Sequence, residues 1–194
     1  MRLLPIVFII FFYNLVNANE IRSIVKVNNY SITNIDLIKE IAFNEILRKR
    51  KLNNTEKEVL LSELIEEKIK SIETDKNNIK VKKIDINNRV TQIIQNYKID
   101  EINQKQIREY IFNKVEIAMK WNKLIAILYS KKLEVNMNEI EEKMKIKKID
   151  SKKKEEIIQI EKTKKINIIS NTFYNEIKRK YLIKNIKWIQ FVFY

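Results

Sequence analysis

The side chains that could do chemistry in this chain are carboxylates, amines and hydroxyls, because its 194 residues include no cysteine, histidine or glycine. The absence of cysteine excludes disulfides and thiolate nucleophiles. The absence of histidine removes the usual general base and the commonest metal ligand, and glycine-rich phosphate loops need glycine. Adjacent carboxylates, such as Glu66 with Glu67 and Glu141 with Glu142, are typical of solvated helix faces. We therefore expect no enzyme activity, no cofactor and no metal site.

The net charge is strongly positive, with 39 Lys and Arg against 25 Asp and Glu, which gives +14. A basic surface of this kind can attract nucleic acid. The composition is dominated by Ile, Lys and Asn, whose codons are rich in A and T, so genome base bias explains much of the charge. Binding to nucleic acid is therefore only an alternative interpretation.

The N-terminus has the pattern of an export signal. After a basic start, an apolar run at 3–16 leads to small residues at Val16 and Ala18, which predicts cleavage between Ala18 and Asn19. A membrane anchor is the alternative, but a spanning helix needs about 20 predominantly apolar residues. The shorter run here also contains Asn14. We expect a periplasmic protein with no stable membrane span after cleavage.

Strand signals occur at both ends of the mature chain. Residues 20–27 and 30–32 alternate as strands around the turn dipeptide at 28–29. The aromatic and β-branched end, 186–194, predicts a further strand that is too apolar to stay unpaired. We expect it to pair with the N-terminal hairpin and to close the helices into one domain.

Between these strands the apolar residues recur at helical spacing. Capping boxes, Thr33 with Asp36 and Thr55 with Glu58, predict the starts of the first two helices. The longest helical pattern, at 100–131, carries this apolar stripe: Ile107, Ile111, Val115, Ala118, Trp121, Ile125 and Leu128. The pattern predicts a mainly α fold, a multi-helix domain with a small β element from the N-terminal hairpin and the C-terminal strand.

The expected organisation has four parts. They are a signal peptide (1–18), a helical N-domain (19–144), a charged connector or solvated helix (145–165), and a C-terminal helix and strand that pack back on the N-domain (166–194).

The order of these elements resembles the SurA-type periplasmic chaperones, which are related to PpiD and to trigger-factor-like chaperones. The segment IRSIVKVNNYSITNIDLIKEI (21–41) is similar to the opening of that family, a strand followed by "VN-G-x-x-IT" and "DL". Asn29 stands near the usual glycine, and asparagine tolerates the same positive φ.

Further segments carry the same resemblance. LLSELIEEKIKSIETDKNNIKV (60–81) is similar to the second helix of the family, although its alanine and glycine positions are replaced. IAMKWNKLI (117–125) resembles the long helix of some members, and FYNEIKRKYLIK (173–184) resembles the C-terminal helix-to-strand end. The resemblance implies a domain like the SurA N-terminal domain.

Full-length members of that family carry parvulin-type prolyl isomerase domains between these parts, and such domains are rich in glycine and use histidine. The corresponding stretch here, 145–172, has neither residue. We therefore expect no prolyl isomerase activity.

The resemblance implies an ATP-independent chaperone that holds unfolded outer-membrane or secreted proteins by hydrophobic and strand-edge contacts. The expected client-binding residues are Tyr97, Tyr110, Phe112 and Met119, because the last three lie off the apolar stripe of the long helix and methionine suits an adaptable surface. The same residues could equally fill contacts between helices. A non-catalytic structural or adaptor protein of the envelope is the alternative function.

Overall fold

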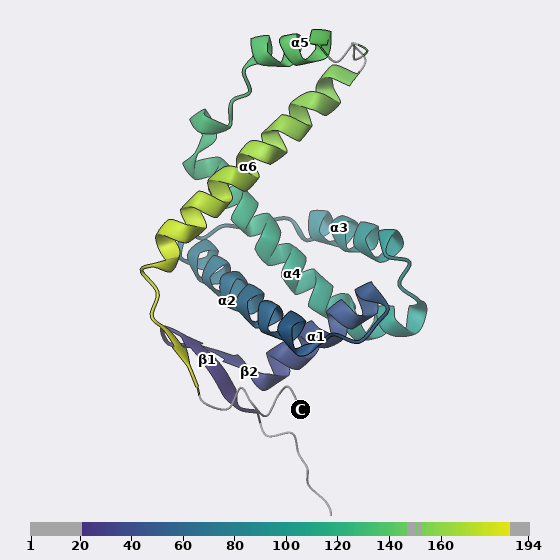
Figure 1. Ribbon diagram of the computed structural model, residues 1–194, viewed down its shortest axis with the longest axis vertical. Helices are drawn as coiled ribbons and strands as arrows, with labels where there is room; N and C mark the ends of the chain where they lie inside the picture. The colour runs from purple at the N-terminus through teal and green to yellow at the C-terminus, as the bar shows by residue number, and fades with distance from the viewer. Residues whose placement is uncertain (1–20, 147–149, 151–152, 187–194) are drawn as a thin grey trace, which may run out of the picture.

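The computed structural model describes residues 21–146, 150 and 153–186, and these residues are mainly helical with a small antiparallel sheet (Figure 1). This confirms the predicted fold class. The elements are β1 (Ser23–Val27), β2 (Tyr30–Thr33), α1 (Asn34–Arg48), α2 (Asn54–Lys76), α3 (Lys83–Asn96), α4 (Glu101–Leu128), the 3-10 helix η2 (Ser130–Leu133), α5 (Met137–Ile146), α6 (Lys154–Lys178) and β3 (Ile183–Asn185). The predicted signal peptide and its cleavage point at Ala18 and Asn19 lie outside the described residues.

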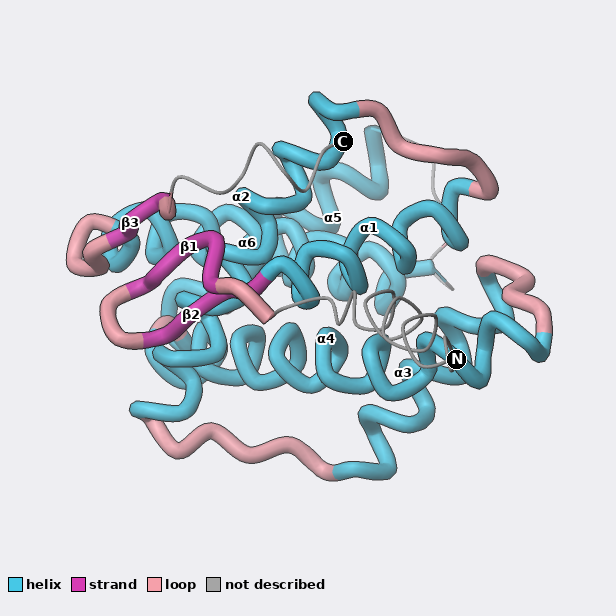
Figure 2. The backbone as a smooth tube through the Cα atoms, turned by 90° about the horizontal axis from the view of Figure 1, so that it is seen from below, coloured by secondary structure: helices cyan, strands magenta, loops and turns pink. Residues whose placement is uncertain are grey.

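The sheet joins the two ends of the described chain, in the order β2-β1-β3 (Figure 2). Val27 of β1 pairs with Tyr30 on one side and with Ile183 on the other, both antiparallel. Asn28 turns the hairpin at φ 52°, and its side chain accepts a hydrogen bond of 2.8 Å from the Leu182 N–H. The predicted pairing of a C-terminal strand with the hairpin is confirmed, but the described strand comes earlier than 186–194. Residues 187–194 lie outside the described residues.

Capping boxes begin the first two helices, and the second is not the predicted one. Thr33 accepts from the Asp36 N–H at 3.2 Å while the Asp36 carboxylate accepts from the Thr33 N–H at 2.8 Å, as expected. In α2 the cap is Asn53, whose side chain accepts from the Glu56 N–H at 2.9 Å, so the prediction of Thr55 was wrong. Asparagine caps as well as threonine. Arg48 also pairs with the Glu56 carboxylate at 2.8 Å, which favours the earlier start.

The helices end without glycine. α2 and α3 both close in a Schellman motif whose left-handed residue is Asn78 (φ 51°) or Lys98 (φ 48°). At the end of α3, the Ile99 N–H donates to the Ile94 carbonyl at 3.1 Å and the Lys98 N–H donates to the Gln95 carbonyl at 3.1 Å. A left-handed lysine is strained because its Cβ crowds the backbone.

Two apolar clusters share α4. The first lies between the sheet, α2, α6 and the C-terminal half of α4, and the second lies between α3 and the N-terminal half of α4. The predicted stripe of α4 is buried at five positions: Ile107, Ile111, Val115, Trp121 and Ile125. Ala118 and Leu128 are exposed and Leu124 is buried in their place, because the partner of α4 changes along its length.

The charged segment 145–165 is largely helical. It includes the end of α5, then residues 154–165 at the start of α6, and these helices pack together over the buried Ile140 (Figure 1). Lys143 and Lys154 pair with Glu161 and Glu141 across this contact, at 3.4 and 2.9 Å. Within the described residues, no helix is long and apolar enough to cross a membrane.

Deleting residues 183–194 should destabilise the protein more than deleting 187–194 alone, because only the longer deletion removes β3 and uncovers β1. The expected difference between the two thermal midpoints is about 4–8 °C, which corresponds to a loss of about 2 kcal/mol, since 1 kcal/mol shifts the midpoint of a chain of this size by about 2–4 °C. Calorimetry of the two truncated chains tests this, and equal midpoints would show that β3 contributes nothing to stability.

Replacing Lys98 by glycine should raise the free energy of unfolding by about 1 kcal/mol. Glycine removes the strain of the left-handed conformation, and its larger loss of chain entropy on folding offsets part of that gain. The matched control is Lys105→Gly, inside α4, which should lower that free energy by about 1 kcal/mol. Urea unfolding measures both. A destabilised Lys98→Gly variant would contradict the strain at this helix end.

Candidate functional site

A groove between α1 and α4 contains the predicted site residue Tyr110. It has a volume of about 250 Å³. Its lining residues come from α1 (Lys39, Ala42 and Ile46) and from α4 (Gln106, Ile107, Glu109, Tyr110 and Asn113). The apolar members come from both helices, while Lys39 and Glu109 supply one charge of each sign. The groove therefore suits an apolar group and has no net charge of its own.

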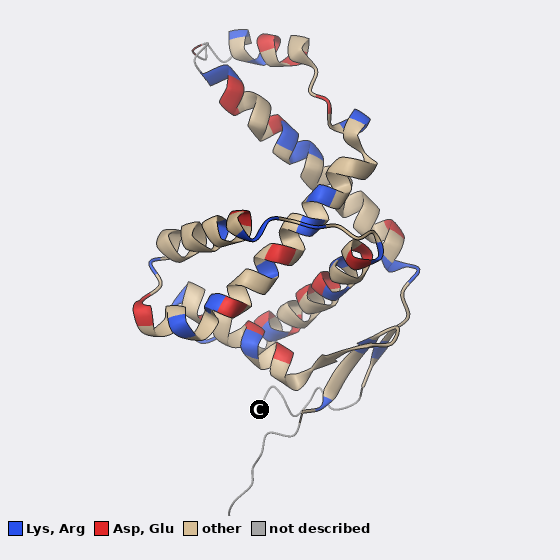
Figure 3. Cartoon of the chain, turned by 180° about the vertical axis from the view of Figure 1, so that it is seen from behind, with Lys and Arg blue, Asp and Glu red and all other residues tan. Residues whose placement is uncertain are grey.

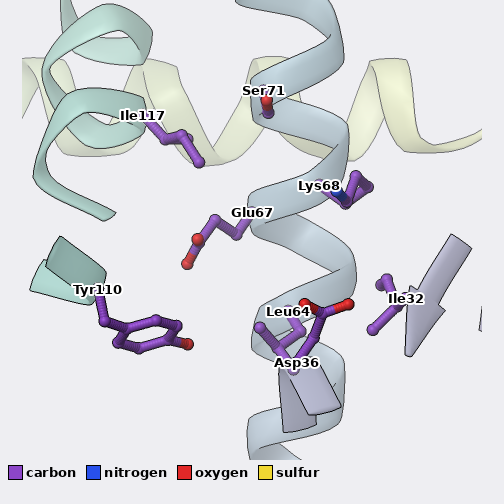
Figure 4. A pocket seen from close by; sticks show the side chains of 8 residues that line it. All are labelled: Ile32, Asp36, Leu64, Glu67, Lys68, Ser71, Tyr110 and Ile117. Atoms are coloured by element: carbon purple, nitrogen blue, oxygen red, sulfur yellow. The ribbon is translucent and has the colours of Figure 1, made fainter. Parts of the chain in front are cut away.

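A smaller cavity, of about 110 Å³, is also lined by Tyr110 (Figure 4). It is lined by Ile32, Asp36, Leu64, Glu67, Lys68, Ser71, Tyr110 and Ile117. In Figure 4 the Glu67 side chain extends from α2 toward α4, and the ring of Tyr110 extends from α4 toward α2. Tyr110 lines both spaces and is therefore part of the wall of each. Phe43 packs edge-on against this ring, with the centroids 5.6 Å apart.

A buried carboxylate holds the wall in place. Glu40 is 1 % exposed and sits on the core-facing side of α1. Its carboxylate accepts hydrogen bonds from the Tyr110 hydroxyl, from the Lys114 ammonium at 2.6 Å and from the Asn44 amide at 2.8 Å. Lys114 also donates to Glu67 at 2.6 Å. One lysine of α4 thus pairs with carboxylates of both α1 and α2.

Burial and neighbouring charges shift the pKa values of several groups in and beside this cluster. Burial alone would lower the pKa of Lys114, but the charges of Glu67 and Glu40 and their hydrogen bonds outweigh it and raise that pKa. Burial and the hydrogen bond to Glu40 raise the pKa of Tyr110 far above its ordinary value. Burial, reinforced by the charge of Glu40, also raises the pKa of Glu63. Lys114 therefore stays charged and Tyr110 stays protonated near neutral pH, and their hydrogen bonds connect α1, α2 and α4.

The four predicted client-binding residues do not face one space. Tyr97 follows α3 and is 49 % exposed. Phe112 and Met119 are partly buried and pack against the cluster between α3 and α4. Met119 also lines a separate groove beside the connection from α2 to α3. Tyr110 faces α1, because it is nine residues from Met119 and therefore lies on the opposite face of α4.

Sequence reasoning missed Glu40 and Lys114. Each lies three residues after a buried apolar residue, Leu37 and Ile111 respectively, and so falls within the apolar stripe of its helix. One signal could have identified this pair. It is a charged residue at a core-facing position of one helix, together with a residue of opposite charge at a core-facing position of another helix.

In the described part of the chain, no group of three or more acidic residues is placed to hold a metal ion. Comparisons with protein-family models, curated proteins and solved structures found no match to this chain. The resemblance to the SurA-type chaperones therefore stays a prediction, and the function is argued from geometry.

Replacing Lys114 by methionine should lower the free energy of unfolding by about 3 kcal/mol, because Glu40 would keep its buried charge without a cation. This loss of stability is near the low end of the range for a broken buried ion pair, because Asn44 and Tyr110 still donate hydrogen bonds to Glu40. Adding Glu40→Gln to the variant should restore part of the loss. Lys105→Met, on the exposed side of α4, is the control and should change little. Urea unfolding measures all three, and an unchanged Lys114→Met variant would contradict the role of the pair.

Proposed function

We propose that this chain is a holding chaperone, which binds unfolded segments of exported proteins without ATP and releases them unchanged. The groove between α1 and α4 carries the proposal. Its volume, about 250 Å³, is below the about 300–1,000 Å³ of most small-molecule sites. A space of this size suits one large apolar side chain of a longer polypeptide, and Tyr110, which contacts Glu40 and Phe43, forms part of its wall.

The sheet offers a second type of contact to an extended segment. β2 and β3 are the outer strands, and each has one side that no other described strand pairs with. Tyr30 of β2 is 52 % exposed. An added strand could bond to such an edge through its main chain, largely independent of its sequence, which suits a protein that holds many clients.

Weak binding follows from these dimensions. Burying one large apolar side chain contributes about 1.5–3 kcal/mol, and an unfolded segment loses conformational entropy when it is ordered. A few such contacts give reversible holding. No step of this activity needs nucleotide, metal or bond cleavage, and the proposal includes no prolyl isomerase activity.

The test is suppression of aggregation, measured by light scattering when an unfolded outer-membrane protein is diluted from urea. Ala42→Trp should require about tenfold more protein for the same suppression, because the indole fills the groove and one buried side chain is worth at least about 1.4 kcal/mol. Ala42 is exposed on α1, so the substitution removes no core contact.

The control is Ala126→Trp, the same substitution at an exposed position of α4 away from the groove. It should suppress aggregation as well as the original chain. If Ala42→Trp is equally active, the groove is not the binding site. If the original chain suppresses nothing, the holding function is wrong and a structural or adaptor role becomes the better interpretation.

A further inference from the structure

We propose that a second groove, between the α2–α3 connection and α4, binds client segments in which an acidic side chain stands next to a large apolar one. The groove has a volume of about 520 Å³ and is lined by Lys80, Val81, Lys82, Asp85, Met119 and Lys123. The occupant is a segment of an unfolded client, so this inference rests on the proposed function.

The floor of the groove is apolar and fixed. Val81 and Met119 are partly buried and pack against the cluster between α3 and α4. The Lys123 ammonium donates to the Lys80 carbonyl at 2.8 Å, which holds the connection against α4. The thioether of Met119 is flexible and polarisable, so it can adapt to apolar side chains of different shape. An apolar client side chain placed here would contact Val81 and Met119, which pack against the cluster between α3 and α4.

The rim of the groove is basic. Its lining has three lysines and one aspartate, 3 − 1, which gives a net charge of +2. Figure 3 shows the basic segments of the connection where it crosses α4, from behind the molecule. In the part of the chain that the structure describes, no carboxylate oxygen lies within 4.0 Å of the ammonium groups of Lys80, Lys82 or Lys123. Nearby Lys120, by contrast, pairs with Glu116 at 2.9 Å and with Asp75 at 3.8 Å.

Charge complementarity therefore favours an anionic partner, and the apolar floor favours one with hydrophobic side chains. A carboxylate beside a leucine or phenylalanine meets both requirements, because its charge reaches the rim lysines while its neighbour covers Val81 and Met119. The volume lies within the range of sites that enclose a ligand of several groups. The groove between α1 and α4 has balanced charge, so the two grooves would select different parts of a client.

The first measurement compares two fluorescently labelled ten-residue peptides by anisotropy. One alternates Glu with Leu and Phe, and the other has Gln in place of every Glu. We expect the acidic peptide to bind about tenfold more tightly at low salt, with the difference lost near 1 M salt, where charges are screened within about 3 Å. Equal binding of the two peptides at low salt would overturn the inference.

The second measurement uses variants of the whole chain. Lys82→Glu with Lys123→Glu should remove the preference for the acidic peptide, while Lys105→Glu with Lys162→Glu, which changes the net charge equally at exposed sites elsewhere, should keep it. Met119→Gln should weaken the binding of both peptides to the same extent. If the control pair loses the preference as well, overall charge and not the groove selects the peptide, and the inference fails.

Two further outcomes separate this inference from the proposed function. Aggregation suppression without preference for the acidic peptide would overturn the groove assignment and leave the holding function standing. Groove-dependent preference in a chain that suppresses no aggregation would overturn the holding function but support the groove. If single-stranded DNA competes for the site and Met119→Gln has no effect on the peptide, the groove is a nucleic-acid surface and the inference is wrong.

Discussion

The pairing of Lys114 with Glu40 and Glu67 is the interaction on which the helical body depends. It connects α1, α2 and α4 at one point, and it lies directly behind the Tyr110 ring. A carboxylate as buried as Glu40 is unfavourable unless its hydrogen bonds are all made. Because the partners come from different helices, the cost of desolvation is recovered only when those helices take one relative position. The cluster therefore sets the geometry of the groove as well as its rigidity.

The overall architecture could be predicted from sequence because it depends on local signals. Asn28 favours the turn of the hairpin, Thr33 with Asp36 marks the start of α1, and apolar spacing marks the long helices. The start of α2 was wrong by two residues, since Asn53 and Thr55 both begin a plausible capping box and the pairing of Arg48 and Arg50 with Glu56 favours the earlier one. A capping pattern alone cannot rank two starts that differ in the contacts their carboxylates make with the preceding loop and helix.

The candidate site was much less predictable. Three of the four predicted residues were chosen because they lie off the apolar stripe of α4, but the neighbour that each one faces depends on which helix lies beside it. Tyr110 faces α1 and Met119 faces the connection into α3, so two residues predicted for one crevice line two separate grooves. The charged pair behind Tyr110 joins residues 74 positions apart in sequence, a relation that apolar periodicity cannot show.

The position of β1 in the middle of the sheet has a consequence for the order of folding. β1 is made early, yet one of its two neighbours, β3, is made about 160 residues later, so the sheet stays incomplete until nearly all of the described chain is available. Contacts of such long sequence separation form late and slow the overall folding rate. During synthesis, β1 and its hairpin would present an unpaired edge, and a newly made chain would itself resemble the unfolded segments it is proposed to hold.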